Sequence, residues 1–132
     1  MIQKVVLADD SATARMIIRR CLEISGLSDV TFYEAQDGMQ ALDLLNNHEV
    51  DLVVTDLNMP NMSGQRLLKE LKSCPRFAGV PVLVVTSASN KALETDLMQR
   101  GALAVVNKPV TPSGLVRALA GIAEGDEDLG WG

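Results

Sequence analysis

The sequence predicts an α/β protein built on a doubly wound, five-stranded parallel sheet with five helices. Five short apolar runs alternate with five segments of helical periodicity, and the connections between them are short. The runs at residues 52–55 and 82–85 are almost uninterrupted by polar residues, which is typical of strands that helices cover on both faces. These observations favour one central sheet between two layers of helices.

The order of the strands follows from the handedness of their connections. Crossovers between parallel strands are right-handed, so a chain with helices on both faces must reverse direction once along the sheet. This favours the strand order 2-1-3-4-5. The first and last helices then cover one face, and the middle three cover the other.

The expected strands are residues 4–8, 30–33, 52–55, 82–85 and 104–106. A helix is expected after each of them: from the cap Asp10 or Ser11 to a stop at Gly26, from Asp37, from the cap Ser63 to Pro75, over about 90–100, and from Thr111 to about 124. Apolar residues at three- and four-residue steps predict the inward faces. These include Ile17 and Cys21 in the first helix and Met98 in the fourth.

A chain of 132 residues is long enough for one domain with its own core. We expect that domain at residues 1–124, followed by a flexible, acidic and Gly-rich tail at 125–132. Cys21 and Cys74 are expected on opposite faces of the sheet, too far apart for a disulfide. His48 is the only histidine, so the sequence offers little for a His-based metal site or a Ser-His-Asp triad.

Charge and hydropathy exclude several classes of partner. The net charge is −5 and there is no basic block, which argues against direct binding of nucleic acid. No stretch approaches the ~20 apolar residues of a membrane-spanning helix, so no membrane partner is expected. Asp9 and Asp10 interrupt the only candidate signal-peptide core, and we therefore expect a cytoplasmic protein.

Asp56 directly follows the buried strand at 52–55 and precedes a polar loop that contains Pro60. Open α/β sheets bind their ligands at the carboxyl ends of the strands, where Asp56 is expected. An aspartate after a strand is also commonly a turn residue or a helix cap. The residues that follow the other strands therefore decide between the two interpretations.

Acidic, hydroxyl and basic side chains follow three of the other strands. Asp9 and Asp10 follow the first strand, Thr86 the fourth and Lys108 the fifth. Each has an ordinary explanation alone: Asp10 as a helix cap, Thr86 as a strand residue and Lys108 as a surface charge. Together with Asp56 they lie at one edge of the predicted sheet, and this joint occurrence indicates a site.

The charges of these residues indicate what the site binds. Three carboxylates repel one another and Lys108 balances only one of them, which leaves a charge near −2 for a divalent cation. Oxygen ligands favour a hard ion, with Mg²⁺ as the expected cofactor. A cation beside Lys108 and Thr86 suits the oxygens of a phosphoryl group. The chain lacks a Gly-rich phosphate loop, so the expected acceptor is Asp56 itself, acting as a nucleophile.

The chain resembles the receiver domains of bacterial two-component response regulators over residues 3–124. The motifs that carry the resemblance are Asp9-Asp10, Asp56-Leu57-Asn58-Met59-Pro60-Asn61-Met62-Ser63-Gly64, Thr86-Ser87 and Lys108-Pro109. It is most similar to the single-domain, chemotaxis-type (CheY-like) regulators. The resemblance implies a phosphorylation-dependent signalling switch that catalyses only its own phosphoryl transfer and dephosphorylation.

The resemblance implies a role for each residue of the site. Asp56 is the phosphoacceptor, which takes its phosphoryl group from a phosphohistidine of a histidine kinase or phosphotransfer protein. Asp9 and Asp10 position Mg²⁺, one of them through water, and Asn58 gives the metal its backbone carbonyl. Lys108 pairs with the phosphoryl oxygens, and its bond to Pro109 is expected to be cis.

Four further positions, Ser87, Ala88, Val105 and Pro109, are implied to modulate the switch. Thr86 matches the hydroxyl that moves to bind the phosphoryl group, and the small Ser87 leaves that group accessible. Asn58 and Ala88 match the positions that tune hydrolysis of the acyl phosphate. Val105 departs from the family, which often has an aromatic residue there that turns inward when the threonine moves; valine has too few rotamers to do so.

The output is implied to be a protein–protein surface formed by the fourth helix, the fifth strand and the fifth helix. It would bind a downstream protein target, with the chain either a monomer or a phosphorylation-dependent dimer. Three alternatives stay open. They are a receiver fragment of a longer regulator or hybrid kinase, a Mg²⁺-dependent small-molecule phosphatase, and a flavin carrier with the flavodoxin-like strand order. The short connections leave no room for a phosphatase cap, and Asp9 and Asp10 would repel the flavin phosphate.

Overall fold

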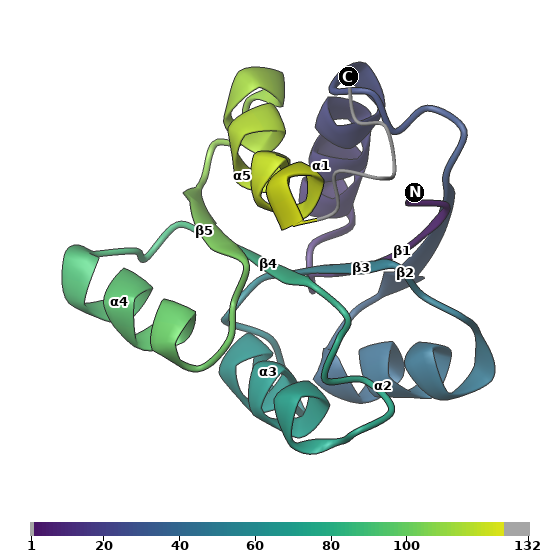
Figure 1. The fold of residues 1–132 in the computed structure, drawn as a ribbon, viewed down its shortest axis with the longest axis vertical. Coiled ribbons are helices and arrows are strands. Elements are labelled where there is room, and N and C mark those ends of the chain that lie inside the picture. The colour runs from purple at the N-terminus through teal and green to yellow at the C-terminus, as the bar shows by residue number, and fades with distance from the viewer. Residues whose placement is uncertain (1, 126–132) are drawn as a thin grey trace.

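The computed structural model describes residues 2–125, in which five strands and five helices alternate along the chain (Figure 1). The elements are β1 (Lys4–Ala8), α1 (Ala12–Ile24), β2 (Thr31–Ala35), α2 (Gly38–Asn47), β3 (Leu52–Thr55), α3 (Gly64–Ser73), β4 (Val82–Thr86), α4 (Lys91–Gln99), β5 (Ala104–Asn107) and α5 (Pro112–Gly125). The strands form one parallel sheet in the order β2-β1-β3-β4-β5, which confirms the predicted topology.

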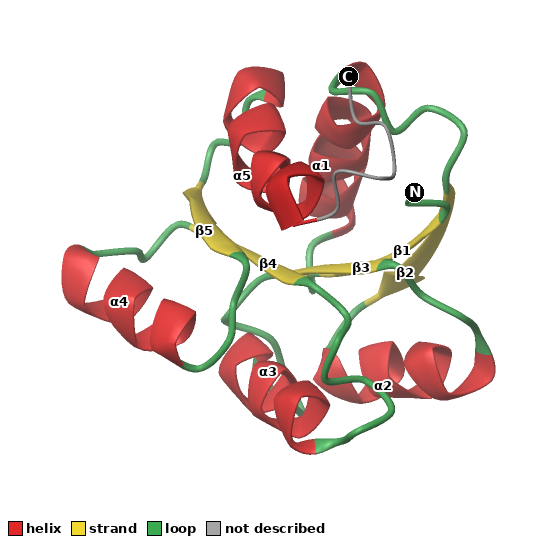
Figure 2. Cartoon of the chain, viewed as in Figure 1, coloured by secondary structure: helices red, strands yellow, loops and turns green. Residues whose placement is uncertain are grey.

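The sheet lies between two layers of helices, and alternate strand residues face each layer. Helices α1 and α5 cover one face, and α2, α3 and α4 cover the other (Figures 1 and 2). Val5 and Leu7 of β1 pack with Ile18 and Leu115 on the first side. Val6, their neighbour in sequence, packs on the opposite side because successive strand residues point to opposite faces. The central strands β3 and β4 are therefore buried along their whole length, as strands with two covered faces should be, whereas the edge strands β2 and β5 are more exposed.

Side-chain caps begin the helices close to the predicted residues. Ser11, rather than Asp10, caps α1, with its side chain accepting a hydrogen bond from the Ala14 N–H at 3.2 Å. Asp37 caps α2 and Ser63 caps α3 in the same way. Gly26, at φ 120°, follows α1 in the left-handed conformation that favours glycine. These caps define where α1, α2 and α3 begin after the carboxyl ends of their strands.

Two residues predicted to face inward are instead largely exposed. Ile17 is 47% exposed and Met98 is 48% exposed, whereas their neighbours Ile18 and Leu97 are buried. Successive helix residues point about 100° apart, so only one member of an adjacent apolar pair can lie on the centre of the buried stripe. The second strand also lies further along the chain than the predicted residues 30–33. It runs to Ala35, whose carbonyl accepts a hydrogen bond from the Asp9 N–H.

The cysteines and the single histidine lie as expected. Cys21 packs on the α1–α5 side and Cys74 on the opposite side, and both are free. His48 is exposed at the end of α2, and its ring stacks on Tyr33 with 4.2 Å between centroids. Residues 126–132 of the predicted tail lie outside the described residues. Within the described part of the chain, the helices are too short or too polar to span a bilayer.

Gly64 joins the start of α3 to the end of β3. Its N–H donates to the Leu57 carbonyl at 2.9 Å, and a Cβ built on it would collide with the carbonyl oxygen of Asp56. Glycine is therefore required by close approach of two backbones, and the approach fixes the main chain at Asp56.

We expect Gly64→Ala to lower the free energy of unfolding by about 1–3 kcal/mol, because the added methyl group forces the Asp56 backbone to move. Gly79→Ala is the matched control, since a Cβ there meets nothing within 4 Å. Its unfolding free energy should stay within about 0.5 kcal/mol of wild type. Urea unfolding of the three proteins measures both values, and equal stability of the two variants would contradict the required close approach.

Candidate functional site

Neighbouring parallel strands bring Asp9 and Asp56 to the same edge of the sheet. Ala8 and Thr55, the last residues of β1 and β3, are partners in register. The ladder continues one residue further, because the Asp56 N–H donates to the Ala8 carbonyl at 3.0 Å. The backbone of both aspartates is therefore held by the sheet rather than by a free loop.

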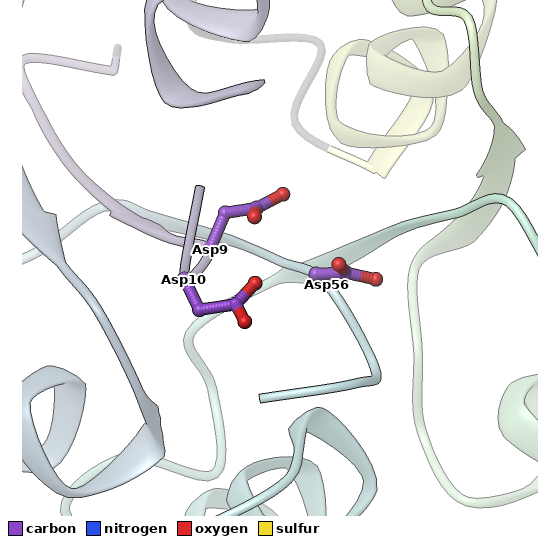
Figure 3. Close-up of side chains that lie close together, drawn as sticks. All are labelled: Asp9, Asp10 and Asp56. Atoms are coloured by element: carbon purple, nitrogen blue, oxygen red, sulfur yellow. The ribbon is translucent and has the colours of Figure 1, made fainter. Parts of the chain in front are cut away.

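Three carboxylates gather at this edge. Asp9, Asp10 and Asp56 each offer an oxygen within 4.8 Å of the others, and Figure 3 shows the three side chains grouped beside the strand ends. Asp9 is 1% exposed and Asp56 is 9% exposed, whereas Asp10 is open to solvent. Buried carboxylates this close repel one another and need compensating charge.

Lys108 supplies part of that charge. Its Nζ lies 2.9 Å from Oδ2 of Asp9 and 3.2 Å from Oδ2 of Asp56. Burial alone would lower the pKa of Lys108, but the hydrogen bond to Asp9 and the charges of Asp56 and Asp9 outweigh it and raise the pKa above its ordinary value. The ammonium group therefore stays charged and bridges the ends of β1 and β3.

The other carboxylate oxygen of Asp9 and of Asp56 each accepts one hydrogen bond from a backbone N–H. Oδ1 of Asp9 accepts from the Ser11 N–H at 2.9 Å, and Oδ1 of Asp56 accepts from the Leu57 N–H at 2.7 Å. Three carboxylates against one ammonium leave a charge near −2. Clustered oxygen donors with this charge fit a hard divalent cation such as Mg²⁺.

Thr86 lies at the neighbouring strand end without joining the carboxylate cluster. It is fully buried, and its Oγ1 accepts a hydrogen bond from the Ala88 N–H at 3.2 Å. Its carbonyl accepts from the Lys108 N–H at 3.0 Å, which ties the end of β4 to the loop that carries the lysine. The site thus brings together Asp9, Asp10, Asp56 and Lys108, with Thr86 connected through the backbone of Lys108.

The other predicted positions surround this centre. Asn58, Ser87 and Ala88 are exposed in the loops that follow β3 and β4. The Lys108–Pro109 peptide bond is cis, as the resemblance implied. Val105 is half-buried and packs into the core under α2, α3 and α4, in register with Val84.

Two contacts beside the site could not be predicted from the sequence. Nothing in the sequence points to a role for Arg15, yet its guanidinium donates to the Asp9 carbonyl at 2.6 Å and to Glu34 at 2.9 Å. Asp37 was recognised only as a helix residue, yet it also accepts a hydrogen bond from Asn61 at 2.7 Å. The available signal was weak: Asn61 lies in a turn-forming stretch, and asparagine tolerates the left-handed conformation that it adopts.

Comparison with known proteins agrees with this geometry. The family model described as the response regulator receiver domain matches residues 5–120. A chemotaxis protein CheY homolog of Campylobacter jejuni is 36% identical over 117 residues, which cover 88% of each chain. The chemotaxis protein CheY1 of Helicobacter pylori is 35% identical, covering 88% of this chain and 93% of that protein. The structure of the chemotaxis response regulator CheY4 of Vibrio cholerae superimposes with a TM-score of 0.78 at 25% identity, covering 91% of this chain and 98% of that one.

A parallel sheet in the order 2-1-3-4-5, with an acidic cluster and a lysine at its carboxyl edge, thus coincides with a family match across most of the chain. The chain belongs to the response regulator receiver domains, the phosphorylation-dependent switches of two-component signalling, and is of the CheY-like type.

Proposed function

We propose that Asp56 is the phosphoacceptor of this receiver domain, and that a histidine kinase or phosphotransfer protein supplies the phosphoryl group from a phosphohistidine. The observation that supports this most is the position of Asp56, a buried carboxylate between Asp9 and Lys108 at the open edge of the sheet. A donor side chain can approach this edge because Asp10, Asn58 and Ser87 beside it are exposed.

The transfer is a displacement at phosphorus. A carboxylate oxygen of Asp56 attacks, an O–P bond forms, and the P–N bond of the phosphohistidine breaks with its electron pair left on the imidazole nitrogen. A carboxylate nucleophile requires no general base. The Lys108 ammonium already lies 3.2 Å from Asp56 and can pair with a phosphoryl oxygen as the transfer proceeds.

The residues that would hold Mg²⁺ are Asp9, Asp10, Asp56 and the backbone carbonyl of Asn58. Their oxygen chemistry fits this ion, and the three carboxylates are close enough to share it. When bound, Mg²⁺ would offset the negative charge that the carboxylates and the phosphoryl oxygens share. The exposed Asp10 also keeps one side of the group open to water, which Mg²⁺ retains in most of its protein sites.

Phosphorylation would act on the output surface through the ends of β4 and β5. It adds roughly −1.5 to −2 charge, which attracts the Lys108 ammonium and offers acceptors to the Thr86 hydroxyl. The Lys108 N–H and the Thr86 carbonyl are already joined, so the two loops would shift together. The affected surface is formed by α4, β5 and α5, where Met98 and Val116 are exposed apolar residues that a downstream protein could cover.

The exposed residues around Asp56 would set the lifetime of the acyl phosphate. Ser87 is small enough to leave the phosphoryl group accessible, and the exposed Asn58 and Ala88 would tune its hydrolysis. Val105 is half-buried against the core and has few rotamers, so the displacement of Thr86 would be transmitted by the strand itself.

We expect wild-type protein to take up one phosphoryl group from acetyl phosphate in the presence of Mg²⁺, and Asp56→Ala to take up none. Phosphate-affinity electrophoresis and intact mass measure the product. Asp43→Ala, which removes an exposed aspartate of α2, is the matched control and should behave as wild type. A phosphorylated Asp56→Ala protein would show that another residue is the acceptor.

We expect Asp10→Ala to raise the Mg²⁺ dissociation constant at least tenfold, because it removes one oxygen ligand. The fold should stay intact, and the unfolding free energy in Mg²⁺-free buffer should not decrease, since the variant loses a carboxylate that repels Asp9 and Asp56. Asp29→Ala, another exposed loop aspartate, is the control for the loss of a negative charge. Calorimetric titration with Mg²⁺ decides the matter, and equal affinities in the two variants would exclude Asp10 as a ligand.

We expect Lys108→Met to lower the unfolding free energy in Mg²⁺-free buffer at pH 7 by about 1–3 kcal/mol, because two buried carboxylates lose their counter-charge while the site remains partly solvated. Because the fold raises the pKa of Lys108, the lysine makes its full contribution to stability at any pH below its ordinary pKa of 10.5. That contribution is lost only as the pH rises through the raised pKa of the folded protein. Lys69→Met, on the exposed side of α3, is the control.

Excess Mg²⁺ should restore more stability to Lys108→Met than it adds to wild type, because the cation replaces part of the missing charge. Urea unfolding with and without Mg²⁺ measures the difference. A Lys108→Met protein as stable as Lys69→Met in metal-free buffer would show that the buried carboxylates do not need the lysine.

A further inference from the structure

The loop between β3 and α3 is attached at its far end to the N-terminus of α2. Asn61 donates from Nδ2 to Oδ2 of Asp37 at 2.7 Å, and the Gly38 N–H donates to the Met62 carbonyl at 3.0 Å. Gly38 also allows close packing, since a Cβ there would lie 2.7 Å from Cγ of Met62. Two hydrogen bonds and one tight backbone contact therefore join segments that are more than 20 residues apart.

Asn61 adopts a backbone conformation that few residues tolerate. Its φ is 64°, the left-handed region, where asparagine is one of the few residues other than glycine found regularly. The hydrogen bond to Asp37 holds the side chain of this same residue. The contact therefore fixes the turn at Asn61 from outside the loop.

The two carboxylate oxygens of Asp37 have separate tasks. Oδ1 accepts from the Gln40 N–H at 2.8 Å and caps α2, whereas Oδ2 accepts from Asn61. The residue is only 4% exposed, and the hydrogen bond from Asn61, followed by that from Gln40, lowers the pKa of Asp37. A helix cap needs a single oxygen, which serine could also provide. The second oxygen serves the loop.

The near end of the loop is hydrogen-bonded to the side chain of Asp56. The Leu57 N–H donates to Oδ1 of Asp56 at 2.7 Å, and the Leu57 carbonyl accepts from the Gly64 N–H at 2.9 Å. Between the anchors at Leu57 and Asn61 lie only residues 58–60. The position of the Asn58 carbonyl therefore depends on both anchors.

We propose that Asp37 and Asn61 are positioning residues for the metal site, because their hydrogen bond holds the loop that presents the Asn58 carbonyl beside Asp56. The inference rests on the proposed function, since it assumes that this carbonyl is a metal ligand. Neither residue touches the metal or the phosphoryl group. Their effect is to restrict the range of positions that the carbonyl occupies before the ion binds, in the way that outer residues orient the ligands of other metal sites.

Asn61→Gly and Asp37→Ser test the contact without removing the features around it. Glycine keeps the left-handed backbone at position 61, and serine keeps a cap for α2, while both lose the Asp37–Asn61 hydrogen bond. We expect each variant to bind Mg²⁺ about tenfold more weakly than wild type in a calorimetric titration. In Mg²⁺-free protein, the amides of residues 57–59, 61 and 62 should exchange faster with solvent than in wild type.

Ile18→Val is the matched control, because it loosens the core on the α1–α5 side, away from the loop. It should lower global stability while leaving Mg²⁺ affinity and loop exchange as in wild type. Suppose that wild-type protein is phosphorylated at Asp56, and that Asn61→Gly and Asp37→Ser both bind Mg²⁺ as tightly as wild type. The inference would then be wrong, and the proposed function would stand. If wild-type protein takes up no phosphoryl group, the proposed function is wrong instead. If amide exchange in the loop is the same in both variants as in wild type, the Asp37–Asn61 hydrogen bond does not hold the loop.

Discussion

Mutual repulsion of three carboxylates is the constraint on which the organisation of this receiver domain depends. Asp9 and Asp56 are nearly buried, and a protein interior does not hold two neighbouring negative charges without compensation. Lys108 bridges both and neutralises one. The residual negative charge makes this edge of the sheet an acidic pocket of the kind at which receiver domains typically bind Mg²⁺.

The sheet makes this arrangement possible because it fixes the main chain of the acids independently of their side chains. The Asp9 and Asp56 N–H groups both continue the hydrogen bonding of the strands. Gly64 then brings α3 against the Asp56 carbonyl, and Arg15 donates to the Asp9 carbonyl. The backbone of the site is thus held from neighbouring strands and helices on both faces, so that charge repulsion cannot be relieved by moving the chain apart.

The fold and the core of the site could be predicted from sequence because they depend on local patterns. Buried strands are recognisable as apolar runs, and the residue that follows each run must lie at the edge of a parallel sheet. Asp9, Asp56 and Lys108 were placed correctly for this reason. Ile17 and Met98 were not, because periodicity locates a stripe on a helix but does not decide which of two adjacent apolar residues occupies its centre.

Long-range side-chain contacts could not be predicted in the same way. The hydrogen bond between Asp37 and Asn61 depends on the path of a loop and on one residue with positive φ. The contact of Arg15 with the Asp9 carbonyl depends on how a long side chain bends back along its helix. The hydroxyl of Thr86 was expected near the acids, and its bond to the Ala88 N–H is a local choice that strand position alone does not reveal.

The hydrogen bond from the Lys108 N–H to the Thr86 carbonyl has a consequence for how information leaves the site. Val105, on the same strand, has no ring that can rotate between two stable orientations. The main chain therefore joins the ends of β4 and β5 directly, in addition to the pairing of the two strands. A movement at one of these strand ends is passed to the other by this backbone hydrogen bond, without a rotating side chain.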